Sequence, residues 1–204
     1  MDLLLFCAVH FCFLIPQSIC NFHEAHMFFY GLFEIVHERN NCKALTRGWM
    51  EQKWMNRAIE LAENGMKAGH GGPFGCVVVK NGELLAEGHN EVILSNDPTS
   101  HAEIVAIRKA CKKLNSFQLS GCDIYASCEP CPMCLGAIYW ARPERVFFAA
   151  NRKDAARIGF DDEFIYEELQ IDPGSRSIPM IFTDNRKALE LFKKWADKED
   201  KTEY

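Results

Sequence analysis

The sequence has too little positive charge for a protein that relies on broad contact with nucleic acid. Its 204 residues include 23 Lys and Arg against 28 Asp and Glu, which gives a net charge of −5 and a pI of about 5.8. Affinity for nucleic acid comes mainly from basic side chains that neutralise phosphates. The charge balance therefore favours a small-molecule substrate, and we expect no nucleic-acid partner, although it allows a local basic patch.

An apolar run long enough to cross a bilayer, about 20 residues, is also missing. The most apolar stretch, residues 3–15, contains His10, is followed by Pro16, and has no Lys or Arg before it. A secretory signal peptide would begin with a basic segment. We expect no membrane partner and interpret residues 1–49 as an upstream extension outside the fold; a cleaved or membrane-held segment is the alternative. The functional domain is then residues 50–204, beginning at or near Met50.

The ten cysteines do not have the arrangement of a secreted disulfide framework, which is usually loop-rich and poor in core residues. Cys76, Cys111 and Cys122 are scattered through apolar segments. Buried, reduced thiols are the ordinary interpretation of such positions. This usage predicts a reducing, cytoplasmic location.

Residues 50–204 contain no internal repeat and no low-complexity tract. Hydrophobic periodicity and turn residues predict an alternation of helices and strands, with an Asn81-Gly82 hairpin turn. The expected helices cover 54–66, a stretch ending near 114, 130–141 and a last one containing residues 188–195; the expected strands cover 76–79, 84–88, 122–126, 145–149 and 178–182. This order predicts an α/β fold, a three-layer α/β/α sandwich around a mixed β-sheet.

Three residues form a candidate metal site: His101, Cys131 and Cys134. One imidazole and two thiolates suit tetrahedral Zn²⁺, and three protein ligands leave the fourth position for water, as in catalytic sites. Cys131 and Cys134 are one helical turn apart near the expected start of a helix, where the helix dipole favours thiolates. The predicted cofactor is therefore Zn²⁺.

Glu103 follows His101 by two residues, which can place its carboxylate beside a metal-activated water without making it a ligand. Such a carboxylate can take a proton from the water and deliver it to a ring nitrogen and to the leaving amine. His-x-Glu followed by Pro-Cys-x-x-Cys, here including Pro130, is the pattern of zinc-dependent nucleobase deaminases.

Other interpretations of these residues are open. Cys128, Cys131 and Cys134 could begin an iron–sulfur site, but no fourth Cys follows at suitable spacing. Cys131 and Cys134 could be a redox pair, or Cys128 could complete a closed structural zinc site in a non-catalytic binding module. His70 and His89 are expected in a loop or at a strand end rather than as ligands. The glycines of 71–75 lack the Lys-Ser/Thr of a phosphate loop.

Residues 50–204 resemble the bacterial-type guanine deaminases of the cytidine/deoxycytidylate deaminase superfamily. The resemblance rests on six segments: Gly71–Gly75, Asn96–Thr99, His101–Glu103, Ser127–Ala141, Ile158–Asp162 and Glu203–Tyr204. It implies hydrolysis of guanine to xanthine and ammonia in purine metabolism, by a homodimer that exchanges its C-terminal segment. Residues 166–184 match the family less closely.

The resemblance also implies roles for individual residues. Glu103 and Asp162 would be catalytic, and the base would be bound by Phe74, Asn90, Ala102, Trp140, Asp162 and Tyr204. For Phe74 and Trp140 the alternative is core packing, for Asp162 a helix cap, and for Tyr204 a frayed terminus.

The rival substrates within this enzyme class are guanosine, a tRNA adenosine and cytosine. A guanosine deaminase would differ in admitting ribose to its pocket. A tRNA adenosine deaminase would share the zinc motif but should carry basic surface for its RNA.

Overall fold

The computed structural model describes residues 51–203, which belong to a single unit spanning Met50–Tyr204. The expectation for residues 1–49 lies outside the described residues and stays a prediction. Among the helices of 51–203, none is long and apolar enough to cross a membrane.

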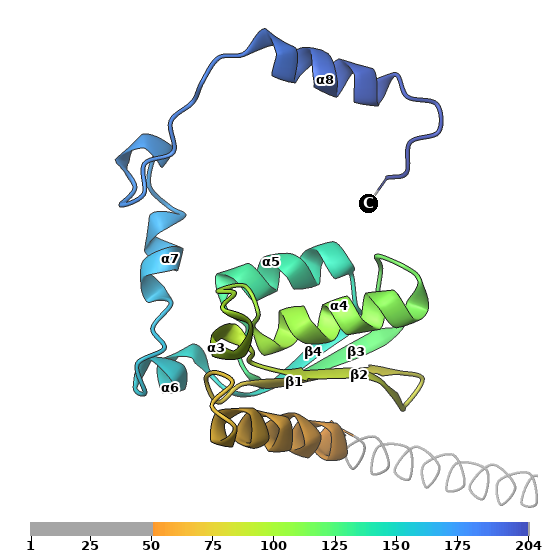
Figure 1. Cartoon of the computed structure of the whole chain (residues 1–204), viewed down its shortest axis with the longest axis vertical. Coiled ribbons are helices and arrows are strands. Elements are labelled where there is room, and N and C mark those ends of the chain that lie inside the picture. Colours follow the sequence, from red (N-terminus) through yellow and green to blue (C-terminus); the bar gives the residue numbers. More distant parts are fainter. Residues whose placement is uncertain (1–50, 204) are drawn as a thin grey trace, which may run out of the picture. The chain divides into compact units, whose positions relative to one another are not determined.

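A four-stranded mixed sheet forms the centre of the unit, in the order β2-β1-β3-β4 (Figure 1). Its strands are β1 (Gly75–Lys80), β2 (Glu83–His89), β3 (Cys122–Cys128) and β4 (Arg145–Ala150). β1 pairs antiparallel with β2 and β3, whereas β3 and β4 are parallel. Each of the first four predicted strands is thus confirmed, with ends shifted by a few residues.

The β1–β2 hairpin turns at the two predicted residues. Asn81 and Gly82 both have positive φ, at 53° and 78°. Positive φ at both central positions is the type I′ geometry, whose twist matches that of the flanking strands.

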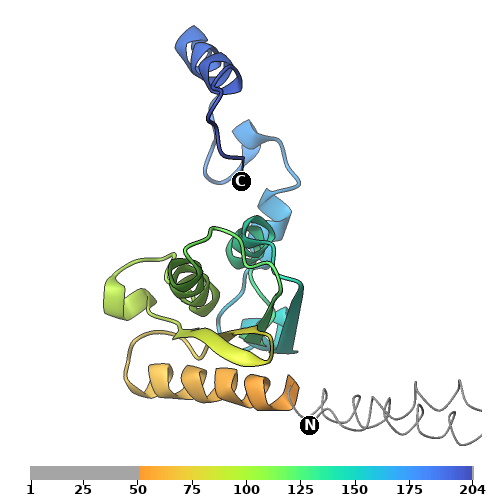
Figure 2. The same cartoon turned by 90° about the vertical axis from the view of Figure 1, so that its right-hand side faces the viewer.

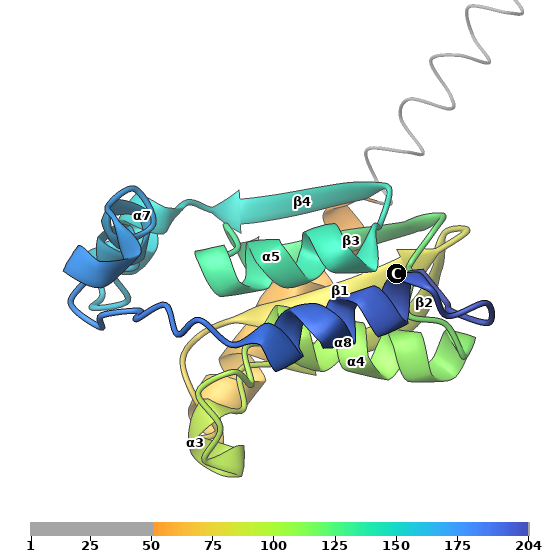
Figure 3. The same cartoon turned by 90° about the horizontal axis from the view of Figure 1, so that it is seen from above.

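Helices cover both faces of the sheet (Figure 2). Residues 51–67 form a helix whose Trp54, Ala58 and Leu61 pack on Val77 and Tyr125. On the other face lie α4 (Ala102–Leu114) and α5 (Pro132–Ala141), which run side by side (Figure 3). Cys76, Val78 and Ile124 meet these two helices in the larger core cluster. The predicted three-layer α/β/α sandwich is confirmed.

One helix prediction needs correction and one helix was not predicted. The helix expected to start at Pro130 starts at Pro132, with Cys131 as its N-cap, because Pro fits the first helical position. Between β2 and α4 lies a further short helix, α3 (Val92–Ser95), which is not among the expected helices and ends at Asn96 with a left-handed backbone.

The last third of the unit is helical and solvent-exposed. It contains α6 (Arg152–Ala156), α7 (Glu163–Glu168), a 3₁₀ turn η2 (Pro173–Ser175) and α8 (Arg186–Ala196). The strand predicted at 178–182 is wrong: these residues pair with no strand of the described chain, and Phe182 is 90% exposed. A strand needs a partner for its backbone N–H and C=O groups, and none lies beside this segment. The predicted last helix is confirmed.

Gly75 is required where the first helix crosses β1. A Cβ at this position would lie 2.1 Å from the Ala58 carbonyl oxygen, a backbone atom. We predict that Gly75→Ala lowers the free energy of unfolding by about 2 kcal/mol, as overpacked cores do, measured by urea denaturation.

The control is Gly136→Ala in α5, where a Cβ would meet nothing within 4 Å. This change should stabilise the protein by roughly 0.5 kcal/mol or more, because Ala is the better helix former. Equal effects of the two changes would contradict close packing at Gly75.

Candidate metal centre and active site

Two helix starts bring the three candidate ligands together. His101 is the N-cap of α4, and Cys131 is the N-cap of α5, with Cys134 in the first turn of the same helix. Both N-caps have extended backbone and neither side chain caps its own helix, so both remain free to face a common point. Each of the three side chains is at least partly buried.

The spacing of the ligand atoms fits a tetrahedral metal ion. His101 Nδ1 lies 3.5 Å from Cys131 Sγ and 3.6 Å from Cys134 Sγ. Bonds of about 2.0 Å to nitrogen and 2.3 Å to sulfur at tetrahedral angles place nitrogen and sulfur roughly 3.5 Å apart. The donor set of one nitrogen and two sulfurs is the kind that zinc prefers.

The cysteines differ in how readily they lose a proton. A hydrogen bond from Cys134 lowers the pKa of Cys131 to about 4, against the opposing effect of burial, and His101 contributes further. The same hydrogen bond, with burial, raises the pKa of Cys134 well above its usual range. The hydrogen bond to Cys131 also raises the pKa of His101. The directions of these shifts make Cys131 the thiol that more readily provides the thiolate zinc requires, and Cys134 the one that would release its proton on metal binding.

Glu103 lies beside this metal group, where the sequence places it. Its side chain is buried, and Cys134 Sγ donates a hydrogen bond to Glu103 Oε2 at 3.4 Å. Burial raises the pKa of the Glu103 carboxyl. Glu103 is not part of the three-residue ligand group.

The metal group opens into a pocket of about 410 Å³. Its walls come from Phe74 before β1, from the first turns of α4 and α5 with the loops that precede them, and from residues 152–165, and they combine aromatic rings with carboxylates. The lining residues are Phe74, Pro98, His101, Glu103, Cys128, Glu129, Cys131, Met133, Arg152, Ala155, Gly159, Phe160, Asp161, Asp162, Phe164 and Ile165. Concave, largely apolar pockets with a few convergent polar groups are typical of small-molecule sites.

Asp162 lines this pocket at the start of α7. It occupies the N-cap position, yet its side chain makes no capping hydrogen bond. Burial raises its pKa, and the nearby Cys131 adds to the effect. The Asp162 side chain therefore does not cap α7, in contrast to the helix-cap alternative.

Phe74 and Asn90 lie close together at the ends of β1 and β2. Phe74 meets Phe160 edge to face, with ring centroids 4.9 Å apart, in the pocket wall. The Asn90 backbone N–H donates to the Phe74 carbonyl, and its buried side-chain Oδ1 accepts from the Val92 N–H. A Cβ on Gly71 would lie 2.0 Å from that oxygen, so glycine is needed there. Ala102, also predicted, is fully buried in the first turn of α4.

Trp140 lies outside the pocket of its own chain, and its role in closing a site stays a prediction. Its side chain is 64% exposed and lines a separate hollow with Ile107 and Phe117. It follows Cys134 by six residues on α5, about 9 Å farther along the helix axis at 1.5 Å per residue. Within one chain, therefore, Trp140 does not wall the pocket. Tyr204 lies outside the described residues.

The alternative metal sites find little support in the geometry. The Cys128 thiol lies apart from the three-residue ligand group and contacts the Asn151 carbonyl oxygen at 3.8 Å. His70 and His89 form a hydrogen-bonded pair, with Nδ1 and Nε2 2.8 Å apart, in the loop and at the strand end where they were expected.

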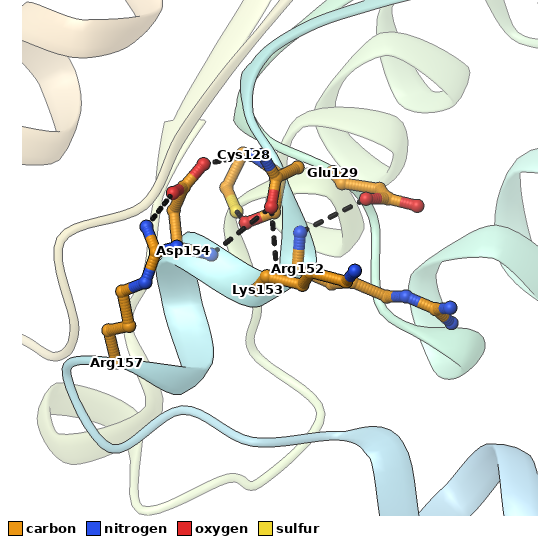
Figure 4. A network of polar contacts seen from close by, with 7 residues as sticks. Cys128, Glu129, Arg152, Lys153, Asp154 and Arg157 are labelled. Atoms are coloured by element: carbon orange, nitrogen blue, oxygen red, sulfur yellow. Dashed lines mark hydrogen bonds and ion pairs between the residues drawn. The ribbon is translucent and has the colours of Figure 1, made fainter.

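Sequence reasoning missed the part played by Glu129 and Arg152. The Arg152 N–H donates to Glu129 Oε2 at 3.0 Å, at the start of α6 (Figure 4). Both residues line the pocket. The only available signal was that Glu129 lies between two cysteines of the motif, which does not reveal its partner.

We predict that Cys131→Ser releases zinc whereas Cys128→Ser retains it. Serine is a poor replacement for a thiolate ligand of zinc. Cys128 lies outside the ligand group, so its replacement leaves all three metal ligands intact. Zinc per chain, measured by atomic absorption after dialysis, should fall to near zero for the first variant only. Equal loss in both would show that Cys128 completes a structural site.

Comparison with known proteins agrees with this geometry. Residues 50–150 match the model of the cytidine and deoxycytidylate deaminase zinc-binding region. The chain is 54% identical over 153 residues to the guanine deaminase of Bacillus subtilis, covering 75% of this chain and 98% of that protein.

The X-ray structure of that guanine deaminase superposes with a TM-score of 0.73 over 75% of this chain and 98% of the other. The tRNA-specific adenosine deaminase of Aquifex aeolicus is 46% identical over only 81 residues, 40% of this chain and 54% of that protein. The similarity to the tRNA deaminase is thus confined to a shorter region. This chain belongs to the zinc-binding cytidine and deoxycytidylate deaminase family, in its guanine deaminase branch.

Proposed function

We propose that the chain hydrolyses guanine to xanthine and ammonia. The observation that carries the proposal is the single pocket that joins a zinc-type ligand group, the buried carboxylate of Glu103 and the carboxylate of Asp162. The extensive similarity to a guanine deaminase supports guanine as the substrate.

His101, Cys131 and Cys134 would hold the zinc ion, which when bound makes hydroxide available near neutral pH. Glu103 is the proton carrier: its carboxylate takes a proton from the attacking water and returns it to the ring nitrogen and the departing amine. Burial beside the ligand group suits it to this role, because the site excludes bulk water that would compete for the proton.

The remaining pocket residues would orient the base. Phe74 and Phe160 offer aromatic surface to the purine ring, and Asp162 accepts from the adjacent N1–H and 2-amino donors of guanine. Because Val92 fixes Oδ1 of Asn90, the Asn90 amide nitrogen remains to donate to the base. Ala102, fully buried between the ligand His101 and Glu103, would act on the base only through its backbone.

The charges in the pocket favour an unphosphorylated substrate. Four carboxylates, Glu103, Glu129, Asp161 and Asp162, line it with a single guanidinium, that of Arg152. A phosphate would lie among like charges, which is unfavourable in a partly buried site. The pocket volume of about 410 Å³ exceeds one purine base, and for this reason guanosine is the second candidate substrate.

We predict ammonia release from guanine, with xanthine formed, when zinc-loaded protein is offered guanine, guanosine, adenine, cytosine and a tRNA anticodon stem-loop in parallel. Glu103→Gln should keep zinc and lose roughly 10²–10⁴-fold in kcat, the usual contribution of a general acid–base group.

Release mainly from guanosine would keep the mechanism and change the substrate. Activity on the stem-loop would overturn the argument from net charge. If a zinc-loaded, folded protein releases ammonia from none of the five substrates, the result would favour a binding module with a structural zinc ion.

We also propose a homodimer in which the C-terminal segment is exchanged. Apolar side chains of α8 are solvent-exposed, among them Leu191, Phe192 and Trp195. Residues 178–182 have a strand-like sequence without a strand partner, while β4 is an edge strand of the described sheet. Exposed apolar stripes and strand edges are surfaces that a second copy can cover. Tyr204 would then complete the pocket of the partner.

A mixing experiment tests the exchange. Glu103→Gln and Tyr204→Ala homodimers, each inactive, should regain activity when unfolded together and refolded, because the hybrid contains one site with both Glu103 and Tyr204. Hybrids without activity would place Tyr204 in the pocket of its own chain. A monomer in analytical ultracentrifugation would contradict the proposed homodimer.

The free thiols of the described residues support a cytoplasmic location. All six cysteines of the described residues are free, including the buried Cys76 and Cys122. Free thiols persist where the compartment is reducing.

A further inference from the structure

Glu129 lines the same pocket as the metal ligands and the residues Phe160 and Asp162. It follows β3 directly and precedes Cys131 by two residues. Its backbone N–H donates to the Ala150 carbonyl at 2.8 Å, and its side-chain Oε2 accepts from the Arg152 N–H at 3.0 Å. The residue therefore forms hydrogen bonds to both ends of the turn that leads from β4 into α6, and Figure 4 shows the bond to Arg152.

The helix α6 does not need Glu129 for its own capping. The Asn151 side chain already accepts from the N–H groups of Lys153 and Asp154, and Asp154 Oδ2 accepts from the Asn151 N–H. This is a complete capping box, which satisfies the helix start locally. The bond from Arg152 to Glu129 is additional, and it joins two separate elements of the structure.

Arg152 extends the connection to α7. Its guanidinium carbon lies 4.7 Å from the ring centre of Tyr166, and its Nη1 lies 3.8 Å from a Glu163 oxygen. Asp162 is the N-cap of α7, immediately before Glu163. A continuous set of contacts thus leads from the loop carrying Cys131, through Glu129 and Arg152, to α7, whose N-cap is Asp162.

We propose that Glu129 is a positioning residue that sets the distance between the metal-ligand loop and the Phe160–Asp162 wall. The proposal rests on the proposed function, because it gives Asp162 and Phe160 a substrate to contact. Residues 152–165 otherwise have mostly exposed or half-exposed side chains and little core packing to fix them. A charge-assisted hydrogen bond in the pocket wall supplies the missing restraint.

Three variants test the role of the hydrogen bond. Glu129→Ala removes the acceptor, and kcat/KM for guanine should fall about tenfold, the order of effect of one hydrogen bond to a charged group. Glu129→Gln keeps a carbonyl acceptor without the charge and should restore most of the activity. Asp154→Ala, which weakens the capping box but leaves Glu129 and Arg152 in place, should keep kcat/KM close to that of the wild type.

Amide hydrogen exchange and zinc content separate positioning from simple loss of structure. Glu129→Ala should bind one zinc per chain, as the wild type does, while residues 151–168 exchange faster. Glu129→Gln should show wild-type exchange there.

Wild-type activity and exchange in Glu129→Ala would overturn the proposal, as would a Glu129→Gln variant as impaired as Glu129→Ala, or an equal loss in Asp154→Ala. If the wild type does not deaminate guanine but the exchange pattern appears, the proposed function fails and the positioning role holds. If guanine is deaminated but that exchange pattern is absent, the positioning role is wrong and the proposed function stands.

Discussion

The meeting of two helix starts at one point is the constraint on which the site depends. His101 and Cys131 are both N-cap residues, and their ligand atoms lie 3.5 Å apart across 30 positions of sequence. That approach requires α4 and α5 to lie side by side on one face of the sheet, with β3 delivering the chain to Cys131. The small residues Ala102, Ala106 and Ala110 allow α4 to lie close to the strands.

The residues that could be predicted from the sequence are those whose function depends on short spacing. His101 and Glu103 are fixed by one helix start, and Cys131 and Cys134 by another, so the motif carries their geometry. The Asn81-Gly82 turn was predictable for the same reason, because its positive φ values are a local property. The alternation of helices and strands was then sufficient to predict the three-layer fold.

The positions that could not be predicted from the sequence are those that depend on tertiary contacts. Glu129 and Arg152 are bonded across 23 positions, and no periodicity indicates such a pair. Trp140 has the aromatic character of a pocket residue but lies too far along α5 to reach the pocket of its own chain. Residues 178–182 have strand-like composition, yet strand formation requires a neighbouring edge in addition to propensity. These positions share one property: their sequence signal is local, whereas their placement depends on residues distant in sequence.

The distribution of charge explains how one pocket can serve both the metal and the base. Cys131, whose pKa is lowered, lies near the buried Glu103 and the half-buried Asp162, and burial together with the charge of Cys131 raises the pKa of both carboxyls. A divalent cation at the ligand group opposes that effect, because it favours the ionised form of every nearby acid. Metal binding and ionisation of the two carboxylates therefore favour each other. With zinc bound, the pocket would offer ionised hydrogen-bond acceptors in the same state in which the metal would supply activated water.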